Sequence, residues 1–330
     1  MKLFLSHAGL GEVKGGVELY AQYLEQVFPD VKKLDYHSLK NELGDVSFPF
    51  FREPKRAELL GKYAEKNFPD ADIFSNGMFC WNLKTKNQIN ICHGTYAAFA
   101  ESAVPKTNPD FYRLRFIYNM YEKIAAKKAK AVVANSESTA SNIKRFFGID
   151  AEIIHPPVDT SLFFPLAKEN SKEKLGWKGV NVLFVGRPEY AKGFDIMQKL
   201  AIKNPEITFN CILSRSFEST LKNLVVITPQ KHSDLPLFYN ASDLVLFPSR
   251  FEGFGFVTIE ALSCGKKIVT LNTGIAPELE SPNIFICHRK KDIEKTFYSA
   301  LLAEESKPKT DFKNKFSFET FRKKWISITH

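Results

Sequence analysis

The sequence predicts an α/β fold made of two Rossmann-like domains, each with a parallel sheet. The first observation is length, because 330 residues are enough for two such domains. The second is a recurring succession of short apolar strand, glycine-bearing loop and helical pattern. This succession occurs three times: over residues 2–27, from Asn181 onward, and over residues 244–265.

The N-terminal segment opens this pattern. Residues 2–6 predict a strand, and a helical pattern runs to about Val27. Between them lies a glycine-rich loop that ends at Gly15 and Gly16. A single loop of this kind fits a tight turn as well as a phosphate cradle.

A Phe-rich segment at 46–54 predicts a surface loop. Its side chains Phe48, Phe50 and Phe51 either cap the core or lie exposed, where they would bind an acceptor or lipid. Farther on, Asp70-Ala-Asp72 has the spacing of an Asp-x-Asp metal motif. Because it directly precedes the apolar Ile73-Phe74, we interpret it as a joint between helix and strand instead.

A strand predicted from Ile89 onward ends in His93-Gly94. Ligands bind at the carboxyl ends of strands in open α/β sheets, so His93 is a candidate site residue, although a lone histidine is also common as a structural residue. The amphipathic helix predicted at 111–130 has a basic face, which suits an anionic membrane or plain solvent. It leads to a strand predicted at 131–137.

Two consecutive prolines, Pro156 and Pro157, predict a stiff connector at a domain boundary. We therefore expect one domain over 1–157 and a second over 158–315. The aromatic-basic segment at 316–330 predicts a last helix that packs back on the first domain.

The second domain begins with a strand that ends at Gly186-Arg187, and Lys192-Gly193 follows after a short loop. Two cations across a strand-to-helix turn can converge on one pyrophosphate, Arg as a bidentate fork and Lys as a point charge. Apolar runs predict further strands at 209–213, 224–228 and 267–271.

The segment 244–265 carries the most specific pattern. A buried strand is followed by the loop Glu252-Gly253-Phe254-Gly255 and by a helical pattern that contains Glu260. Glycines let the backbone approach a ligand, and N–H groups at a helix start favour an anion. On a helix the eight-residue separation of the glutamates corresponds to roughly 12 Å, which suits an extended ligand and rules out action on one bond.

This segment resembles the Glu-x7-Glu signature of GT4-family retaining glycosyltransferases (glycosyltransferase group 1). Gly186-Arg187 with Lys192-Gly193, and the turn 272–278, are similar to further motifs of the family. The resemblance covers nearly the whole chain. It implies a GT-B fold, in which two Rossmann-like domains face a central cleft. At the connector the family usually has Asn-Gly-Val-Asp, and His155-Pro156-Pro157 departs from it.

The resemblance also implies roles for single residues. Glu260 would bind the ribose hydroxyls of a nucleoside diphosphate sugar, and Glu252 would hold its sugar. Residues of both domains would bind the donor, partly through their backbone groups. Four side chains would act in catalysis. The donor-binding set is Gly15, Gly16, Gly186, Pro229, Gln230, Gly253, Phe254, Gly255 and Glu260, and the catalytic set is His93, Arg187, Lys192 and Glu252.

The implied reaction keeps the anomeric configuration without a cofactor or metal. Double displacement needs two carboxyl groups about 5 Å apart, and the sequence offers no such pair. Our hypothesis is front-face substitution, in which Arg187 and Lys192 stabilise the leaving phosphate and this phosphate takes the acceptor's proton.

Composition narrows the partners. A net charge of +9 suits nucleic acid, an anionic membrane or a polyanionic small molecule. Because no nucleic-acid motif is present, the charge favours a peripheral contact with anionic lipid. The resemblance implies a glycan, glycolipid or small-molecule acceptor. Five scattered cysteines and no apolar run of eighteen residues predict a cytoplasmic protein, at most attached to the inner face of the membrane.

Two other functions remain open from the sequence. One is a phosphorylase or epimerase relative on the same fold, which a lysine-bound pyridoxal cofactor would reveal for the phosphorylase. The other is a non-catalytic basic protein that keeps only the fold and binds anionic vesicles or nucleic acid.

Overall fold

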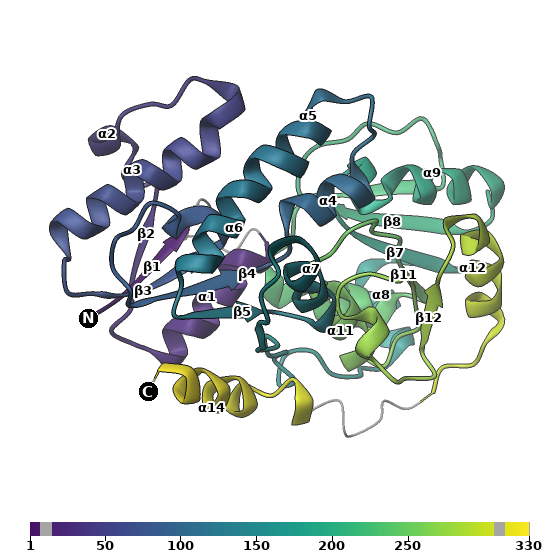
Figure 1. The fold of residues 1–330 in the computed structure, drawn as a ribbon. Coiled ribbons are helices and arrows are strands. Elements are labelled where there is room, and N and C mark those ends of the chain that lie inside the picture. The colour runs from purple at the N-terminus through teal and green to yellow at the C-terminus, as the bar shows by residue number, and fades with distance from the viewer. Residues whose placement is uncertain (7–14, 307–313, 330) are drawn as a thin grey trace. The chain divides into compact units, whose positions relative to one another are not determined.

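The computed structural model describes residues 1–6, 15–306 and 314–329. The chain forms two compact units, each with its own parallel sheet (Figure 1). Unit 1 consists of Met1–Pro157 and Phe318–His330, and unit 2 consists of Val158–Ser317. Residues 7–14, which belong to the predicted glycine-rich loop, lie outside the described residues.

Unit 1 is built on a six-stranded parallel sheet with the order β2-β1-β3-β4-β5-β6. Its strands are β1 (Lys2–Ser6), β2 (Lys32–Asp35), β3 (Asp72–Asn76), β4 (Gln88–Cys92), β5 (Ala131–Ala134) and β6 (Glu152–Ile153). Its helices of eight or more residues are α1 (Gly16–Val27), α3 (Arg52–Asn67), α4 (Tyr96–Ala103), α6 (Asn119–Lys128), α7 (Glu137–Phe147) and α14 (Phe318–Thr329). Short helical segments are α2 (Lys40–Leu43), η1 (Pro49–Phe51), η2 (Gly77–Cys80), α5 (Pro109–Tyr112) and η3 (Arg113–Tyr118).

Unit 2 also has a six-stranded parallel sheet, with the order β12-β11-β10-β7-β8-β9. Its strands are β7 (Asn181–Gly186), β8 (Thr208–Leu213), β9 (Leu224–Ile227), β10 (Leu244–Phe247), β11 (Ile268–Leu271) and β12 (Ile284–Cys287). Its helices are α8 (Lys168–Leu175), α9 (Phe194–Lys203), α10 (Leu235–Ala241), α11 (Phe256–Ser263) and α12 (Ile293–Leu302), with the short η4 (Tyr190–Lys192), η5 (His232–Asp234), η6 (Ala276–Glu278) and η7 (Lys290–Asp292). Numbered from β7, this is the Rossmann order 3-2-1-4-5-6, whose ligands bind where β7 and β10 lie side by side. The predicted α/β fold with two parallel sheets is thus confirmed.

The C-terminal helix α14 belongs to unit 1. Trp325 is fully buried, and its ring lies 6.4 Å from that of Phe28 and 5.4 Å from that of Phe74. Burial of an aromatic ring of this size is one of the larger single contributions to a core. Aromatic packing therefore ties the last segment of the chain to the first sheet.

Two details differ from the sequence predictions. The helix predicted at 111–130 includes a π-helical segment, η3, so its side chains do not follow one 3.6-residue period. The helix with Glu260 starts only at Phe256, because Gly255 has a φ of 92° that ends the loop before it. Glu260 therefore lies about one turn into α11, and the 12 Å estimate, which assumed one helix through both glutamates, does not apply.

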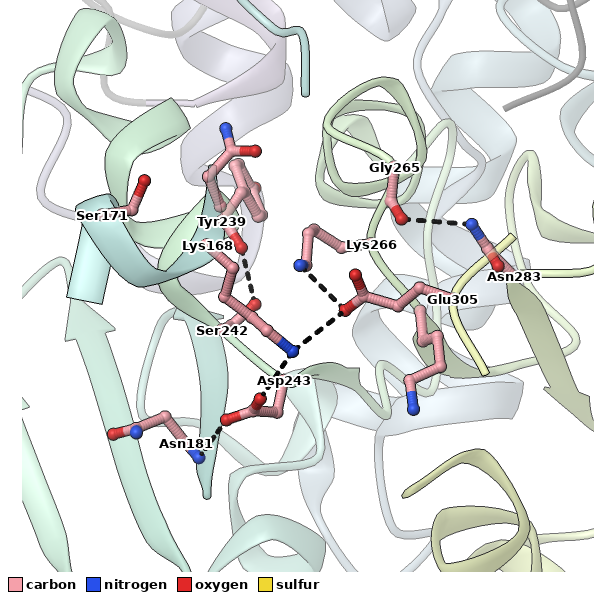
Figure 2. A network of polar contacts seen from close by, with 12 residues as sticks. Lys168, Ser171, Asn181, Tyr239, Ser242, Asp243, Gly265, Lys266, Asn283 and Glu305 are labelled. Atoms are coloured by element: carbon pink, nitrogen blue, oxygen red, sulfur yellow. Dashed lines mark hydrogen bonds and ion pairs between the residues drawn. The ribbon is translucent and has the colours of Figure 1, made fainter. Parts of the chain in front are cut away.

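The amino edge of the unit 2 sheet is held by a polar network (Figure 2). Asp243, just before β10, accepts hydrogen bonds from the ammonium groups of Lys168 at 3.0 Å and Lys172 at 2.7 Å, and from the backbone N–H of Asn181 at 2.8 Å. Burial alone would raise the pKa of Asp243, but these donors outweigh it and the pKa is lowered. Because the network joins the starts of β7 and β10, it supports the arrangement that brings the ends of these strands together at the opposite edge.

Candidate functional site

The carboxyl ends of β7 and β10 bring two predicted site residues into contact. Lys192 follows β7 and Glu252 follows β10, and the Lys192 ammonium lies 2.6 Å from a Glu252 carboxylate oxygen. Both side chains are largely buried, with exposed fractions of 22% and 11%. This ion pair marks the point of the sheet where ligands of Rossmann domains bind.

Gly193 allows this contact. Its φ is 73°, and a Cβ atom at this position would lie 2.1 Å from the carbonyl oxygen of Pro248. The backbone before α9 therefore packs directly on the loop after β10, which only glycine permits. This explains why glycine follows Lys192 in the sequence. Gly193 lets the two backbone segments approach closely, and this approach brings the Lys192 side chain to Glu252.

Arg250 fastens the same turn from the other side and was not predicted from the sequence. Its guanidinium makes two hydrogen bonds to Asp195, at 2.6 and 2.8 Å, and donates another to the carbonyl of Tyr190. It also lies 3.6 Å from the Tyr190 ring centre, and its backbone N–H donates to Ala191. Burial would raise the pKa of Asp195, but Arg250 outweighs it and the pKa is lowered. Arg250 therefore positions the turn that carries Lys192.

We expect Arg250→Lys to lower the free energy of unfolding by about 1–3 kcal/mol and to weaken donor binding. Lysine keeps the charge but cannot form the paired hydrogen bonds or stack on Tyr190. Thermal unfolding and nucleotide titration measure the two effects. The control is Arg289→Lys, because Arg289 is 68% exposed and, among the described residues, has its one ion pair with Asp292 in its own turn. Equal melting temperatures and donor affinities for Arg250→Lys and the native protein would contradict this role.

Glu260 is buried on α11 and fully engaged in this structure. One carboxylate oxygen accepts a hydrogen bond from the Tyr239 hydroxyl at 2.8 Å, and the other lies 2.8 Å from Nε2 of His232. Burial alone would lower the pKa of His232, but the hydrogen bond and charge of Glu260 raise it. Burial, aided by Glu260, raises the pKa of Tyr239. These two partners fix the orientation of the carboxylate that we predicted to bind ribose.

Arg187 does not take part in the Lys192–Glu252 ion pair. It follows β7, its side chain is 55% exposed, and its Nε lies 3.5 Å from a Glu189 oxygen. The other oxygen of Glu189 accepts a hydrogen bond at 2.8 Å from Arg215, which follows β8. Glu189 thus holds two arginines at the same edge of the sheet, and Arg215 is a cation that sequence reasoning missed.

The remaining predicted donor-binding residues of unit 2 lie on loops at this edge. Gly186 ends β7, Gly253 and Phe254 are buried before α11, and the Phe254 carbonyl accepts a hydrogen bond at 2.7 Å from the backbone of Ile275. Pro229 and Gln230 lie between β9 and η5, and only Lys231 separates them from His232. The amide of Gln230 donates to the carbonyl of Thr228 at 2.8 Å.

His93, Gly15 and Gly16 belong to unit 1. His93 follows β4, and its ring packs edge-on against Tyr20 at a centroid distance of 4.8 Å. Tyr20 in turn packs on Phe321 and Trp325 of α14. Gly15 and Gly16 are exposed at the start of α1. The roles of all these residues stay predictions.

Sequence reasoning missed the charged residues that hold the site. Asp195, Arg250, His232 and Arg215 act through partners that are distant in the chain. Only Arg215 and Arg250 gave a local signal, because each follows a buried strand within three residues. Among residues 1–6, 15–306 and 314–329, no three His, Cys, Asp or Glu side chains gather as a metal site would require. Within the same residues, no helix is both long and apolar enough to span a bilayer.

Comparison with known families matches most of the chain. A model described as glycosyl transferases group 1 matches residues 167–315, and one described as glycosyltransferase family 4 matches residues 37–162. Relatives include the D-inositol 3-phosphate glycosyltransferase of Mycobacterium sp. strain KMS, 25% identical over 67% of this chain and 55% of the relative. That of Mycobacterium tuberculosis strain H37Ra is 28% identical over 67% and 50%. The chain spans about half the length of these curated relatives.

Solved structures share the fold over almost the whole chain. A sucrose-phosphate synthase from Thermosynechococcus elongatus superposes with a TM-score of 0.73 and 17% identity, over 99% of this chain and 96% of the other. HepE from Anabaena, in complex with UDP and glucose, superposes with a TM-score of 0.71 and 18% identity, over 98% of each chain.

Proposed function

The chain belongs to the glycosyltransferases of group 1 and family 4 and has their GT-B fold, and from this premise we propose a more specific function. It is a retaining enzyme that moves a sugar from a UDP or GDP sugar to a hydroxyl acceptor. The observation that carries the proposal is the Lys192–Glu252 ion pair at the switch point of the unit 2 sheet, with the oriented carboxylate of Glu260 on the helix that follows.

In this proposal the donor lies along the carboxyl edge of unit 2. Glu260 accepts hydrogen bonds from ribose hydroxyls, since each carboxylate oxygen has a second lone pair beside the one engaged by Tyr239 or His232. Lys192 and Arg187 contact the diphosphate. Glu252 accepts a hydrogen bond from a sugar hydroxyl and holds the Lys192 ammonium in place. HepE has been solved with UDP-glucose, so UDP sugars are tested first.

The proposed step is a front-face substitution. The bond from the sugar C1 to the leaving phosphate oxygen breaks, and its electron pair stays on that oxygen. The acceptor oxygen bonds to C1 from the same face, and its proton passes to the phosphate. Lys192 and Arg187 offset the negative charge that develops, a task that the proposal assigns to them and not to a metal or cofactor.

The proposal places the acceptor in cell-surface glycan, lipopolysaccharide or glycolipid synthesis at the inner face of a membrane. The support is the surface of unit 1, where aromatic side chains are exposed beside basic ones. On the resemblance alone, His93 of unit 1 is assigned to the donor sugar, and Gly15 and Gly16 are assigned to the donor sugar or its phosphates.

A thermal-shift screen with UDP, GDP, ADP and their sugar conjugates tests donor binding. A ligand at about a hundred times its dissociation constant adds roughly 2.7 kcal/mol of stability. We expect a shift with one base and its loss in Glu260→Gln, which keeps the shape but weakens the acceptor for ribose hydroxyls.

The control is Glu294→Gln, because Glu294 pairs with Lys203 on the surface of the same unit. It is expected to keep the shift. If a folded protein shows no shift with any nucleotide, the donor assignment fails and the non-catalytic alternative gains. An equal shift in Glu260→Gln would leave a donor but remove Glu260 from its site.

A further inference from the structure

Unit 1 exposes large apolar side chains in two segments that meet. Seven such side chains are exposed among its described residues, and all but Met1 lie in these segments. They are Phe48, Phe50 and Phe51 in and beside η1, and Tyr112, Phe116 and Met120 on the helical run from α5 to α6. The Arg113 guanidinium donates to the carbonyl of Pro49 at 3.2 Å, which fastens the first segment to the second.

These aromatic side chains are exposed but are packed against one another. Phe48 is 63% exposed and Phe116 is 57% exposed, yet each stacks on a neighbour: Phe48 on Phe51 at 6.0 Å and Tyr112 on Phe116 at 6.3 Å. The expectation that residues 48–51 cap the core is wrong, because η1 turns their side chains outward. Clustered exposed apolar groups of this size mark an interaction surface.

The helical run from α5 to α6, which carries Tyr112, Phe116 and Met120, is also rich in cations. Residues 101–130 contain seven Lys or Arg and three acidic residues, of which Glu122 is buried. The other two acids are already paired: Asp110 with Arg113 at 3.0 Å, and Glu101 with Arg115 at 2.6 Å and Arg145 at 2.8 Å. Lys106, Lys123 and Lys127 make no ion pair among the described residues, so the surface has an excess of positive charge.

From these observations we propose that this aromatic-basic surface docks on an anionic lipid bilayer. Exposed aromatic rings fit the boundary between headgroups and acyl chains, and each nearby lysine attracts anionic headgroups. A second copy of the chain is a poorer occupant, because a symmetric contact would set the same unpaired cations against each other. Only the purpose of the docking, to reach a membrane-held acceptor, rests on the proposed function.

Co-sedimentation of the full chain with vesicles tests the surface. The vesicles contain phosphatidylcholine alone or with phosphatidylglycerol at about one lipid in three. We expect binding to the anionic vesicles only, weakening as salt is added. Phe48→Ser/Phe51→Ser/Phe116→Ser is expected to reduce the affinity about tenfold or more. Lys123→Ala/Lys127→Ala is expected to reduce it roughly tenfold to thirtyfold.

A matched control replaces apolar side chains that are exposed elsewhere. Ile202→Ser/Leu302→Ser alters residues that are 63% and 87% exposed in unit 2 and is expected to bind vesicles like the native protein. Melting curves establish that each variant is folded, and Phe48→Ser alone replaces the triple variant if that one unfolds.

Three results would overturn the proposal. They are no binding of native protein to anionic vesicles at low salt, equal binding by native and triple-variant protein, and a concentration-dependent dimer in light scattering that the triple variant abolishes. Donor binding is measured by thermal shift on the same preparations. Vesicle binding without a thermal shift by any donor would reject the proposed function and support the docking surface. A thermal shift without vesicle binding would support donor binding and reject the docking surface.

Discussion

Lys192→Ala is expected to reduce turnover by about 10²–10³, the usual cost of removing one preorganised group that stabilises developing charge. In the structure the Lys192 ammonium is 2.6 Å from Glu252 and is held there by the close contact of Gly193 with Pro248. Without this ammonium, the proposed step loses a cation assigned to the leaving phosphate, and Glu252 loses its ion-pair partner. Release of nucleoside diphosphate from the donor found by thermal shift measures the effect.

The matched control for Lys192 is Lys199→Ala, which removes the same charge from the exposed face of α9, two turns away in the chain. We expect near-native turnover from it. If Lys192→Ala turned over like the control while still binding donor and acceptor, stabilisation of the leaving group would have to come from elsewhere. Arg187 and Arg215, which Glu189 holds at the same edge, would then be examined next.

The elements that could be predicted from the sequence are those with a local pattern. The apolar runs that end at Cys92, Gly186 and Phe247 are strands, because burial in a parallel sheet leaves a signal within about ten residues. The two-domain α/β class follows from the same patterns, and the family from the motifs around Glu252 and Lys192.

The contacts that orient the candidate site could not be predicted this way. Arg250 and Asp195 are 55 residues apart, and His232 and Glu260 are 28 apart. Each of these side chains looks like an ordinary surface charge in its own segment. Their meeting depends on the strand order that places β7 beside β10 and on the packing of α10 against α11. Long-range pairing of this kind has no local signature.

Glu122 in unit 1 is another residue whose role could not be predicted from the sequence. It is buried on α6, and a carboxylate oxygen accepts a hydrogen bond at 2.9 Å from the backbone N–H of Tyr96, at the start of α4. Burial raises the pKa of Glu122 to about 8, against the lowering effect of this hydrogen bond. The group is therefore protonated in the folded protein at a pH where the unfolded chain has already lost the proton.

This difference makes unit 1 less stable as the pH rises. Between the unfolded pKa of about 4.3 and the folded pKa of about 8, the folded state binds more protons, so the free energy of unfolding falls through this window and levels off above it. The full loss is on the order of 3–5 kcal/mol. We expect Glu122→Gln, which keeps an oxygen that can accept from Tyr96 but has no acidic proton to lose, to remove most of this decline.

Urea unfolding at pH 5, 7 and 9, followed by tryptophan fluorescence, measures the loss, because Trp81 and Trp325 report on unit 1. Glu25→Gln serves as the control, since Glu25 is 44% exposed and pairs with Lys33 on the surface. A midpoint in the native protein that stays constant from pH 5 to pH 9, or declines equally in Glu122→Gln, would contradict a buried neutral carboxyl group. Because Glu122 bonds to Tyr96, three residues after His93, the same titration would loosen the segment that carries this candidate site residue.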